Sequence, residues 1–222
     1  LVKGAPVAVG GVPAMSAAPG AAASVPSLTV AERGHVLAAG SMRWTIGPLG
    51  LVVSAVDQTT DRELVDPAHP AGALQLLRDT PRDWDAWNID REDSDLVAEP
   101  LVVDDVAVGD DGASVVVRRH VGRTSIVQTY RVAGTGALEI RVEVDWHERQ
   151  KMLKLAFPLA LAADTATSEI QFGHLSRPTH ANTSWDAARF ETVAQRWMLL
   201  DEGAYRVCVA NDASYGHDVR RG

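Results

Sequence analysis

The clearest structural signal in this chain is the segment Leu138-Glu-Ile-Arg-Val-Glu-Val144. Apolar residues alternate with charged ones along its whole length, which is typical of a β-strand with one buried and one solvated face. No amphipathic helical period of useful length is present, and the run 187–198 fits a helix or a strand equally well. Similar alternation occurs in four earlier runs: Met42–Ile46, Leu51–Val56, Ser114–Arg118 and Thr124–Val132.

Turn-forming residues separate these runs. Gly47-Pro48, Gly109-Asp-Asp-Gly112 and Gly134-Thr-Gly136 all carry such chemistry, and the runs around the last two are predicted to form antiparallel hairpins. Many short strands with turns about every ten residues indicate a two-layer sandwich rather than a parallel α/β sheet. The sequence therefore predicts an all-β fold.

The composition excludes several classes of protein. With 46% hydrophobic and 23% charged residues among 222, the chain has the balance of a globular domain. Its net charge of -8, from 21 basic and 29 acidic residues, argues against a nucleic-acid partner. Cys208 is the one cysteine, so no disulfide can form within the chain. No run approaches the ~20 apolar residues of a membrane helix.

The segment Glu169–Glu191 is the main candidate for function, because it gathers imidazole, guanidinium, amide, carboxylate and indole groups without a helical or strand period. Pro178 fixes its own backbone and biases Arg177 toward an extended shape, which would hold Arg177 and His180 in place. Asn182, Trp185 and Asp186 follow closely. The segment is open to three interpretations: a loop facing a substrate, a contact with another domain, or an ordinary turn.

A second candidate is the segment Asp79–Asp90, which places Trp84 and Trp87 among several aspartates, including Asp85. Indole faces cover the apolar face of a hexose, and carboxylates accept hydrogen bonds from its hydroxyl groups. The competing interpretation is a structured loop whose indoles fill the core and whose aspartates cap turns. A glycosidic acid/base pair would need carboxylates roughly 5 to 10 Å apart, a distance that sequence spacing does not establish.

Metal binding and nucleophilic catalysis are not predicted. His174, His180 and His217, with Asp186 and Asp218, offer ligand types that zinc uses, but their spacing matches no compact zinc motif. The Gly-x-Ser-x-Gly nucleophile motif does not occur, nor does a phosphate-binding glycine loop.

Three segments together resemble a known family. Asp79–Asp90, Asp145-Trp-His-Glu-Arg-Gln-Lys-Met-Leu-Lys-Leu-Ala-Phe-Pro158 and Glu169–Glu191 are similar, in order and approximate spacing, to the C-terminal region of the glycoside hydrolase family 38 α-mannosidases of the bacterial and cytosolic branch. The resemblance implies a two-sheet antiparallel supersandwich similar to that of galactose mutarotase. It implies a β-sandwich C-terminal domain over residues 36–222, incomplete at its C-terminal end, and a lead-in or linker over residues 1–35.

The same resemblance implies a division of labour. Members are retaining hydrolases of α-linked mannose whose nucleophile, acid/base and divalent metal, generally zinc, belong to an N-terminal barrel absent from this chain. We therefore expect no catalytic residue, metal or cofactor here. The chain would brace the catalytic and helical domains of a cytoplasmic enzyme and form part of the wall around an α-mannoside, through these residues: Trp84, Asp85, Arg177, His180, Asn182, Trp185 and Asp186.

Two other functions are compatible with the sequence. A stand-alone carbohydrate-binding β-sandwich would also use the Trp and Asp clusters. An epimerase of the mutarotase type is suggested by fold class alone, which is a poor guide to function. A sandwich that lacks closing strands exposes sheet edges, and exposed edges pair with other chains. The sequence therefore also predicts self-association into a homo-oligomer.

Overall fold

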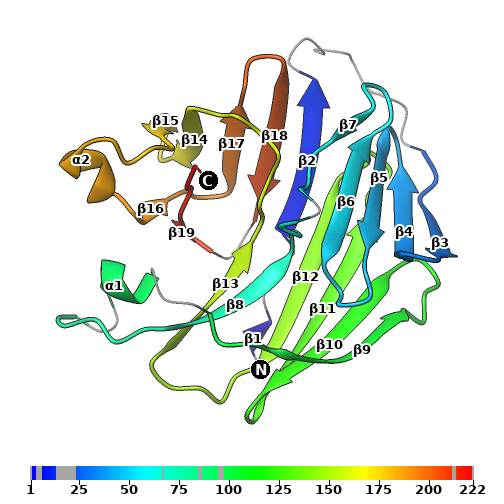
Figure 1. Cartoon of the computed structure of the whole chain (residues 1–222), viewed down its shortest axis with the longest axis horizontal. Helices are drawn as coiled ribbons and strands as arrows, with labels where there is room; N and C mark the ends of the chain where they lie inside the picture. The colour runs from blue at the N-terminus through cyan, green and yellow to red at the C-terminus, as the bar shows by residue number, and fades with distance from the viewer. Residues whose placement is uncertain are drawn as a thin grey trace.

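The computed structural model describes residues 2–3, 7–13, 24–66, 68–84, 87–94, 98–211 and 214–221. Strands dominate it (Figure 1), and its two helices are single turns, α1 (Arg91–Ser94) and α2 (Ser184–Ala187). The strands form antiparallel sheets, so the predicted all-β class is confirmed. No helix among these residues is long and apolar enough to cross a membrane.

The larger sheet has ten strands. Its order is β15-β14-β17-β18-β2-β12-β11-β10-β9, with β1 paired to β12. The bounds are β1 Val2–Lys3, β2 Val7–Pro13, β9 Val102–Val108, β10 Val115–Val121, β11 Thr124–Val132, β12 Leu138–Asp145, β14 Thr165–Ile170, β15 Gly173–Pro178, β17 Trp197–Asp201 and β18 Tyr205–Ala210.

The smaller sheet has five strands in chain order, and two short ribbons complete the structure. The five strands are β3 Ser27–Ala31, β4 Gly34–Ala39, β5 Met42–Ile46, β6 Val52–Asp57 and β7 Arg62–Glu63. The ribbons pair β8 (Ala73–Arg78) with β13 (Lys151–Ala156), and β16 (Thr192–Val193) with β19 (Gly216–His217).

The hydrophobic core lies between the five-stranded sheet and one part of the larger sheet. Its largest member is Trp44 on β5, which is 1% exposed. Side chains of β4, β5 and β6 meet side chains of β10, β11, β12 and β18 there. The alternating strands therefore direct every second residue inward, as in these buried members: Leu37, Trp44, Ile46, Val52, Val115, Val117, Tyr130, Leu138, Ile140 and Val207.

The strand expectations agree closely with the structure. Thr124–Val132 is strand β11 with identical bounds, and the segment 138–144 is β12 with one residue added. Both predicted hairpins are confirmed, because β9 pairs antiparallel with β10, and β11 with β12. The ambiguous run 187–198 contributes to strands β16 and β17.

The turn between β11 and β12 joins the two sheets. Gly136 has a φ of +91°, and a Cβ there would lie 2.9 Å from the carbonyl oxygen of Ala39, so glycine is required. The indole Nε1 of Trp44 donates a 2.9 Å hydrogen bond to the carbonyl of Gly136. A core side chain of β5 thereby holds this turn in register.

Polar side chains of β11 also point into the interior. The Tyr130 hydroxyl donates to the carbonyl of Gly50 at 2.9 Å, and the Gln128 amide donates to the carbonyl of Gly72 at 2.9 Å. Burial raises the pKa of Tyr130, so the hydroxyl remains a donor at neutral pH. Two carbonyls beside β6 are thus paired with donors from the opposite sheet, as buried carbonyls require.

Arg119 on β10 adds a third link between the sheets. It is 4% exposed, and its guanidinium donates to the carbonyls of Gly50 at 2.9 Å and Leu49 at 3.1 Å. Desolvation lowers its pKa. The loop that follows β5 is therefore bound by donors from two neighbouring strands of the larger sheet.

Strands on both sides of residue 35 belong to the same sheets. The backbone of β2 lies between β12 and β18, and β3 pairs with β4. The proposed division into residues 1–35 and 36–222 stays a prediction. Self-association also stays a prediction; the outer strands of the larger sheet are β9 and β15, and those of the smaller sheet are β3 and β7.

Replacing Tyr130 with phenylalanine should lower the free energy of unfolding by about 1–2 kcal/mol, because Gly50 and Gly72 lose a buried donor while the ring still packs. Urea denaturation followed by circular dichroism measures this. Tyr215→Phe is the matched control, since Tyr215 is largely exposed, and it should change the value by less than about 0.5 kcal/mol. Equal effects of the two substitutions would contradict a structural role for the Tyr130 hydroxyl.

Candidate functional site

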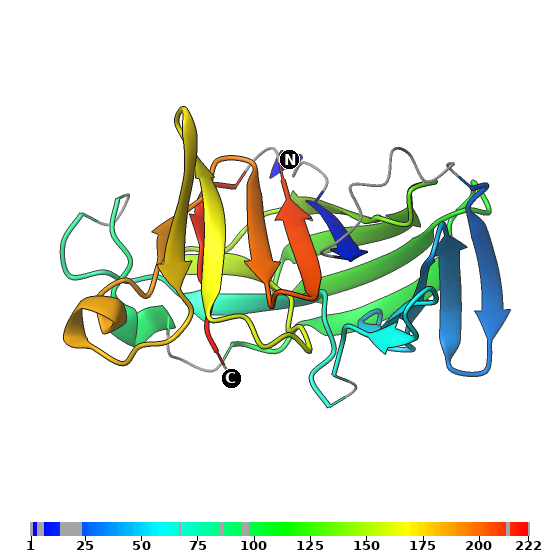
Figure 2. The same ribbon diagram turned by 90° about the horizontal axis from the view of Figure 1, so that it is seen from above.

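The segment Glu169–Glu191 forms a hairpin followed by a helical turn. Strand β14 turns at Gln171 and Phe172 and returns as β15, which ends at Pro178. The hairpin projects beyond the other strands (Figure 2). The chain then passes through α2 and reaches β16. Residues that are far apart on an extended chain are therefore folded back against one another.

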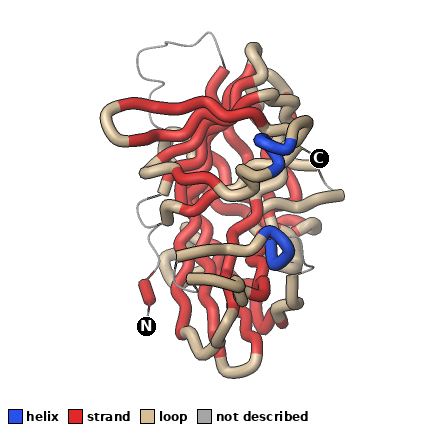
Figure 3. Tube along the Cα trace, turned by 90° about the vertical axis from the view of Figure 1, so that its left-hand side faces the viewer, coloured by secondary structure: helices blue, strands red, loops and turns tan. Residues whose placement is uncertain are grey.

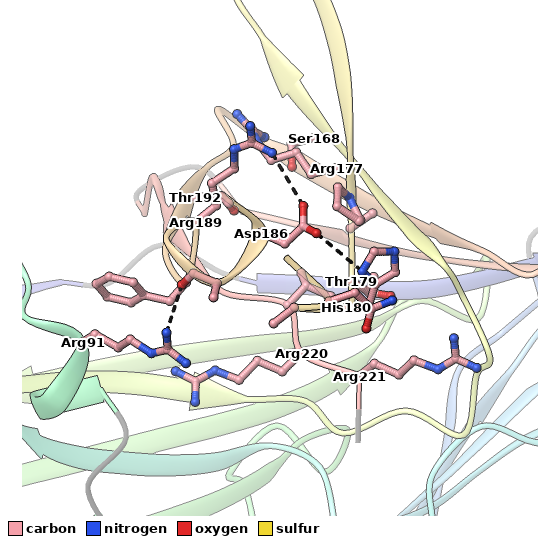
Figure 4. A pocket seen from close by; sticks show the side chains of 17 residues that line it. Arg91, Ser168, Arg177, Thr179, His180, Asp186, Arg189, Thr192, Arg220 and Arg221 are labelled. Atoms are coloured by element: carbon pink, nitrogen blue, oxygen red, sulfur yellow. Dashed lines mark hydrogen bonds and ion pairs between the residues drawn. The ribbon is translucent and has the colours of Figure 1, made fainter. Parts of the chain in front are cut away.

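A cavity of about 470 Å³ lies between this segment and the end of the chain (Figure 4). It brings together Arg177, His180, Asn182 and Asp186, which the sequence singled out. A second hollow of about 530 Å³ shares Arg177 with it. The remaining lining residues are Arg91, Ala166, Ser168, Pro178, Thr179, Ala181, Ala187, Arg189, Phe190, Thr192, Val219, Arg220 and Arg221.

Asp186 is held by a capping box at the start of α2. The Thr183 hydroxyl donates to Asp186 Oδ2 at 2.7 Å and accepts from the Asp186 backbone N–H at 3.1 Å, while the Thr183 N–H donates to Oδ2 at 3.2 Å. This reciprocal pattern fixes the carboxylate. The Thr183 hydroxyl holds the pKa of Asp186 below its usual range, with smaller effects from the Thr183 backbone, His180 and Arg189.

Two basic side chains, His180 and Arg189, lie near the Asp186 carboxylate without forming a hydrogen bond to it. His180 Nδ1 lies 3.8 Å from Asp186 Oδ2, and Arg189 Nη1 lies 3.9 Å from Oδ1 (Figure 4). Both distances exceed those of hydrogen bonds. His180 Nδ1 is buried and has no hydrogen-bond partner. The Nδ1 atom of His180 therefore keeps unused hydrogen-bonding capacity.

Arg177 lies near the end of strand β15, where the sheet and the following residues hold its backbone. It pairs with Ala166 of β14. Two residues later the Thr179 hydroxyl donates to the carbonyl of Ala163 at 2.7 Å, and the Thr179 carbonyl accepts from the N–H of Arg221 at 3.0 Å. The Nη1 atom of Arg177 is nevertheless buried without a hydrogen-bond partner.

The other predicted site residues lie elsewhere. Trp185 is 74% exposed and Trp84 is 77% exposed, and neither lines the cavity. Asp85 lies outside the described residues. Trp84 and Trp87 are both exposed, so these indoles do not fill the core. The interpretation of this segment as a loop whose indoles fill the core is therefore wrong on that point. A role for Trp84, Asp85 and Trp185 in sugar contact stays a prediction.

Sequence reasoning missed most of the arginines. Arg91 of α1 reaches the cavity, where its Nη1 donates to the Ala187 carbonyl at 3.4 Å. Arg220 and Arg221 come from the end of the chain. The adjacent pair Arg220-Arg221 was a visible basic signal. Nothing in the sequence, however, indicated that this pair and Arg91 line the same cavity as Arg177.

The cavity lacks the groups that hydrolysis of a glycosidic bond uses. Among its lining residues Asp186 supplies the one carboxylate, whereas a retaining glycosidase needs two about 5 Å apart. Within the part of the chain that the structure describes, no three His, Cys, Asp or Glu side chains gather as a metal site would require. The arrangement is suited to binding and positioning.

Comparison with known proteins gives consistent matches. The family described as "Glycosyl hydrolases family 38 C-terminal domain" matches residues 37–222. Human Alpha-mannosidase 2C1 is 38% identical over 189 residues, which cover 82% of this chain and 18% of that protein. Alpha-mannosidase G of Dictyostelium discoideum is 33% identical, covering 80% and 17%, and Alpha-mannosidase of Saccharomyces cerevisiae is 31% identical, covering 82% and 18%. The chain thus spans less than a fifth of each relative's length.

Replacing Thr183 with valine should raise the pKa of Asp186 toward the ordinary aspartate value of about 3.9, because the hydroxyl donor that favours the carboxylate is lost. A carbon-13 NMR titration of the Asp186 carboxyl group measures this. Because the pKa of Asp186 is lower in the folded state, its ionised carboxylate stabilises the folded turn at pH values above the unfolded-state pKa. That stabilisation is lost as the pH falls through the folded-state pKa. Thr167→Val, on the neighbouring hairpin, should leave the titration unchanged; an unchanged titration in Thr183→Val would refute the capping assignment.

Proposed function

The chain belongs to the family of glycosyl hydrolase family 38 C-terminal domains, and on that basis we propose that it is a non-catalytic part of a retaining α-mannosidase. The observation that carries the proposal is the match over residues 37–222 together with relatives that are α-mannosidases and extend far beyond the matched region. Among the described residues that line the cavity, Asp186 is the one carboxylate; because a retaining glycosidase uses two, this supports the placement of the catalytic pair in another part of the enzyme.

We propose that the end of the domain bearing α1 and α2 contacts the other domains of the parent enzyme. Both helices lie on the left-hand side of Figure 1, the side that faces the viewer in Figure 3. Large aromatic side chains are exposed on or next to them: Trp87 precedes α1 and is 91% exposed, and Trp185 lies in α2. Phe172, at the tip of the projecting β14–β15 hairpin, is fully exposed as well. Exposed aromatic groups are enriched where proteins meet other proteins or ligands.

In this arrangement the cavity would form part of the wall of the sugar site. Arg177, His180, Asn182 and Asp186 would orient the substrate or the loops that surround it. The catalytic aspartates and a divalent metal, with zinc as the expected ion, would come from the preceding catalytic domain. The contribution of this chain would then be preorganisation rather than bond cleavage.

We further propose a cytoplasmic location for the parent enzyme. Cys208 is partly buried, and burial raises the pKa of its thiol, which keeps it protonated and unreactive. A chain of this size with one unreactive thiol uses no disulfide of its own and suits a reducing compartment.

A stand-alone carbohydrate-binding module remains the second candidate, favoured by the exposed indoles of Trp84, Trp87 and Trp185. Such rings form stacking platforms for sugars. Titration of the isolated chain with methyl α-mannoside, followed by tryptophan fluorescence, distinguishes the two functions. Saturable binding by the chain alone favours the module, whereas binding that requires the rest of the enzyme favours the mannosidase part.

The 222-residue chain should not hydrolyse p-nitrophenyl α-mannoside, while the full-length parent should do so. Arg177→Ala and Asp186→Ala in the parent should each lower kcat/KM about 10- to 100-fold, because a preorganised wall is lost. Arg43→Ala is the control, since Arg43 is exposed on the five-stranded sheet, and it should leave kcat/KM unchanged. Hydrolysis by the isolated chain would refute the division of labour.

Chelation provides a separate test of where the metal belongs. A chelator should abolish hydrolysis by the parent, and zinc or cobalt should restore it. The thermal unfolding midpoint of the isolated chain should not respond to the chelator, because no structural ion is expected in it. A drop of several degrees in that midpoint would place a metal in this chain and contradict the proposal.

A further inference from the structure

The cavity between α2 and the end of the chain has an unusual charge. Its lining contains Asp186 as the one carboxylate and five arginines: Arg91, Arg177, Arg189, Arg220 and Arg221. The whole chain carries a net charge of -8, so this clustering opposes the overall balance. The arginines come from α1, β15, the residue after the α2 cap and the end of the chain, and they lie around the cavity (Figure 4).

The carboxylates near these arginines neutralise the cavity only in part. Asp186 is bonded by Thr183 and stands 3.9 Å from Arg189. Arg221 is paired with Asp164 at 2.6 Å, and Arg220 with Asp218 at 3.2 Å. Asp218 is also 3.5 Å from Lys154. Lys154 in turn is paired with Glu191. These carboxylates offset part of the positive charge of the lining.

Arg177 supplies the strongest indication of a missing partner. Its Nη1 atom is buried and has no hydrogen-bond acceptor, whereas the residue as a whole is half-buried and lines the cavity. Buried polar atoms are normally paired. Leaving such a donor unmatched destabilises the folded chain. An anion in the cavity would offer acceptors to the guanidinium of Arg177, whose planar fork suits two oxygen atoms of one group.

The guanidinium groups of this lining favour an oxyanion over a sugar hydroxyl as their direct partner. Hydroxyl groups need acceptors as well as donors, yet arginine offers only donors, and the Asp186 carboxylate already accepts from Thr183. An oxyanion accepts hydrogen bonds and donates none, so it matches a lining of guanidinium groups. The volume of about 470 Å³ also leaves room for the molecule or segment that bears the anion.

We propose that this cavity is an oxyanion site in which Arg177 binds a carboxylate or phosphate group, supported by Arg189 and the other arginines. The oxyanion comes from one of two sources. It belongs to a small acidic ligand, or it is a carboxylate side chain from the remainder of the parent polypeptide. The anion site rests on the cavity alone, whereas the second source also rests on the proposed function.

The first experiment titrates the 222-residue chain with inorganic phosphate and with acetate at constant ionic strength, with chloride as the reference ion. Arginine side-chain N–H signals in NMR report binding. We expect saturable shifts with phosphate, and Arg177→Met should weaken the affinity at least about tenfold by removing charge-assisted hydrogen bonds. Arg43→Met, which removes an exposed arginine distant from the cavity lining, should leave the affinity unchanged.

Two further variants keep the proposal testable if Arg177→Met does not fold. Arg189 is largely exposed, so Arg189→Met should fold normally and weaken phosphate binding about threefold or more. Asp186→Asn should strengthen binding severalfold, because it removes the negative charge nearest to the anion, a result that a purely structural role would not produce. Shifts that do not saturate, or equal losses in Arg177→Met and Arg43→Met, would overturn the proposal.

The same titration on the full-length parent separates the two sources. If a carboxylate of the parent fills the cavity, phosphate binds the 222-residue chain but not the parent, and Arg177→Met weakens the association of the domains. If the ligand is a small acid, phosphate binds both with similar affinity. Failure of phosphate to bind either protein overturns the anion site and leaves the mannosidase assignment, which is tested by hydrolysis, untouched.

Discussion

The two sheets are held in one register by hydrogen bonds from interior side chains to the carbonyls of Gly50 and Gly72. Tyr130, Gln128 and Arg119 donate across the core to these carbonyls, which could otherwise not be solvated. Gly50 and Gly72 have φ values of +67° and +78°, and a Cβ at Gly72 would lie 2.8 Å from the Tyr130 hydroxyl. The close approach of loop and strand therefore depends on both the donors and the glycines.

That fixed register extends along the larger sheet to the cavity. Strand β18 belongs to the core through Tyr205 and Val207, and the Tyr205 hydroxyl donates to Asp57 of the smaller sheet at 3.0 Å. From β18 the ladder continues through β17 and β14 to β15, which carries Arg177. A rigid sandwich thus supports a hairpin and a loop, the usual arrangement of scaffold and binding residues.

The exposed side chains are consistent with a domain that acts within a larger enzyme. Phe172, Trp84, Trp87 and Trp185 lie at the surface, while the arginines gather in a partly enclosed space. The first group presents apolar area at the surface, and the second presents hydrogen-bond donors. The described lining of the cavity supplies one carboxylate, Asp186, whereas retaining glycosidases use a pair.

The sequence was sufficient for the fold class and for part of the site. The alternation of apolar and polar residues in segments 124–132 and 138–144 predicts strands, because successive side chains of a strand point to opposite faces of the sheet. Turns that contain glycine predict the hairpins. Arg177, His180, Asn182 and Asp186 were found because they cluster within ten residues. Arg91, Arg220 and Arg221 were not, since no local pattern reports that separate segments meet at one cavity. Whether an indole fills a core or faces water was likewise settled by packing between distant strands, and the exposed Trp84 and Trp87 contrast with the buried Trp44 for that reason.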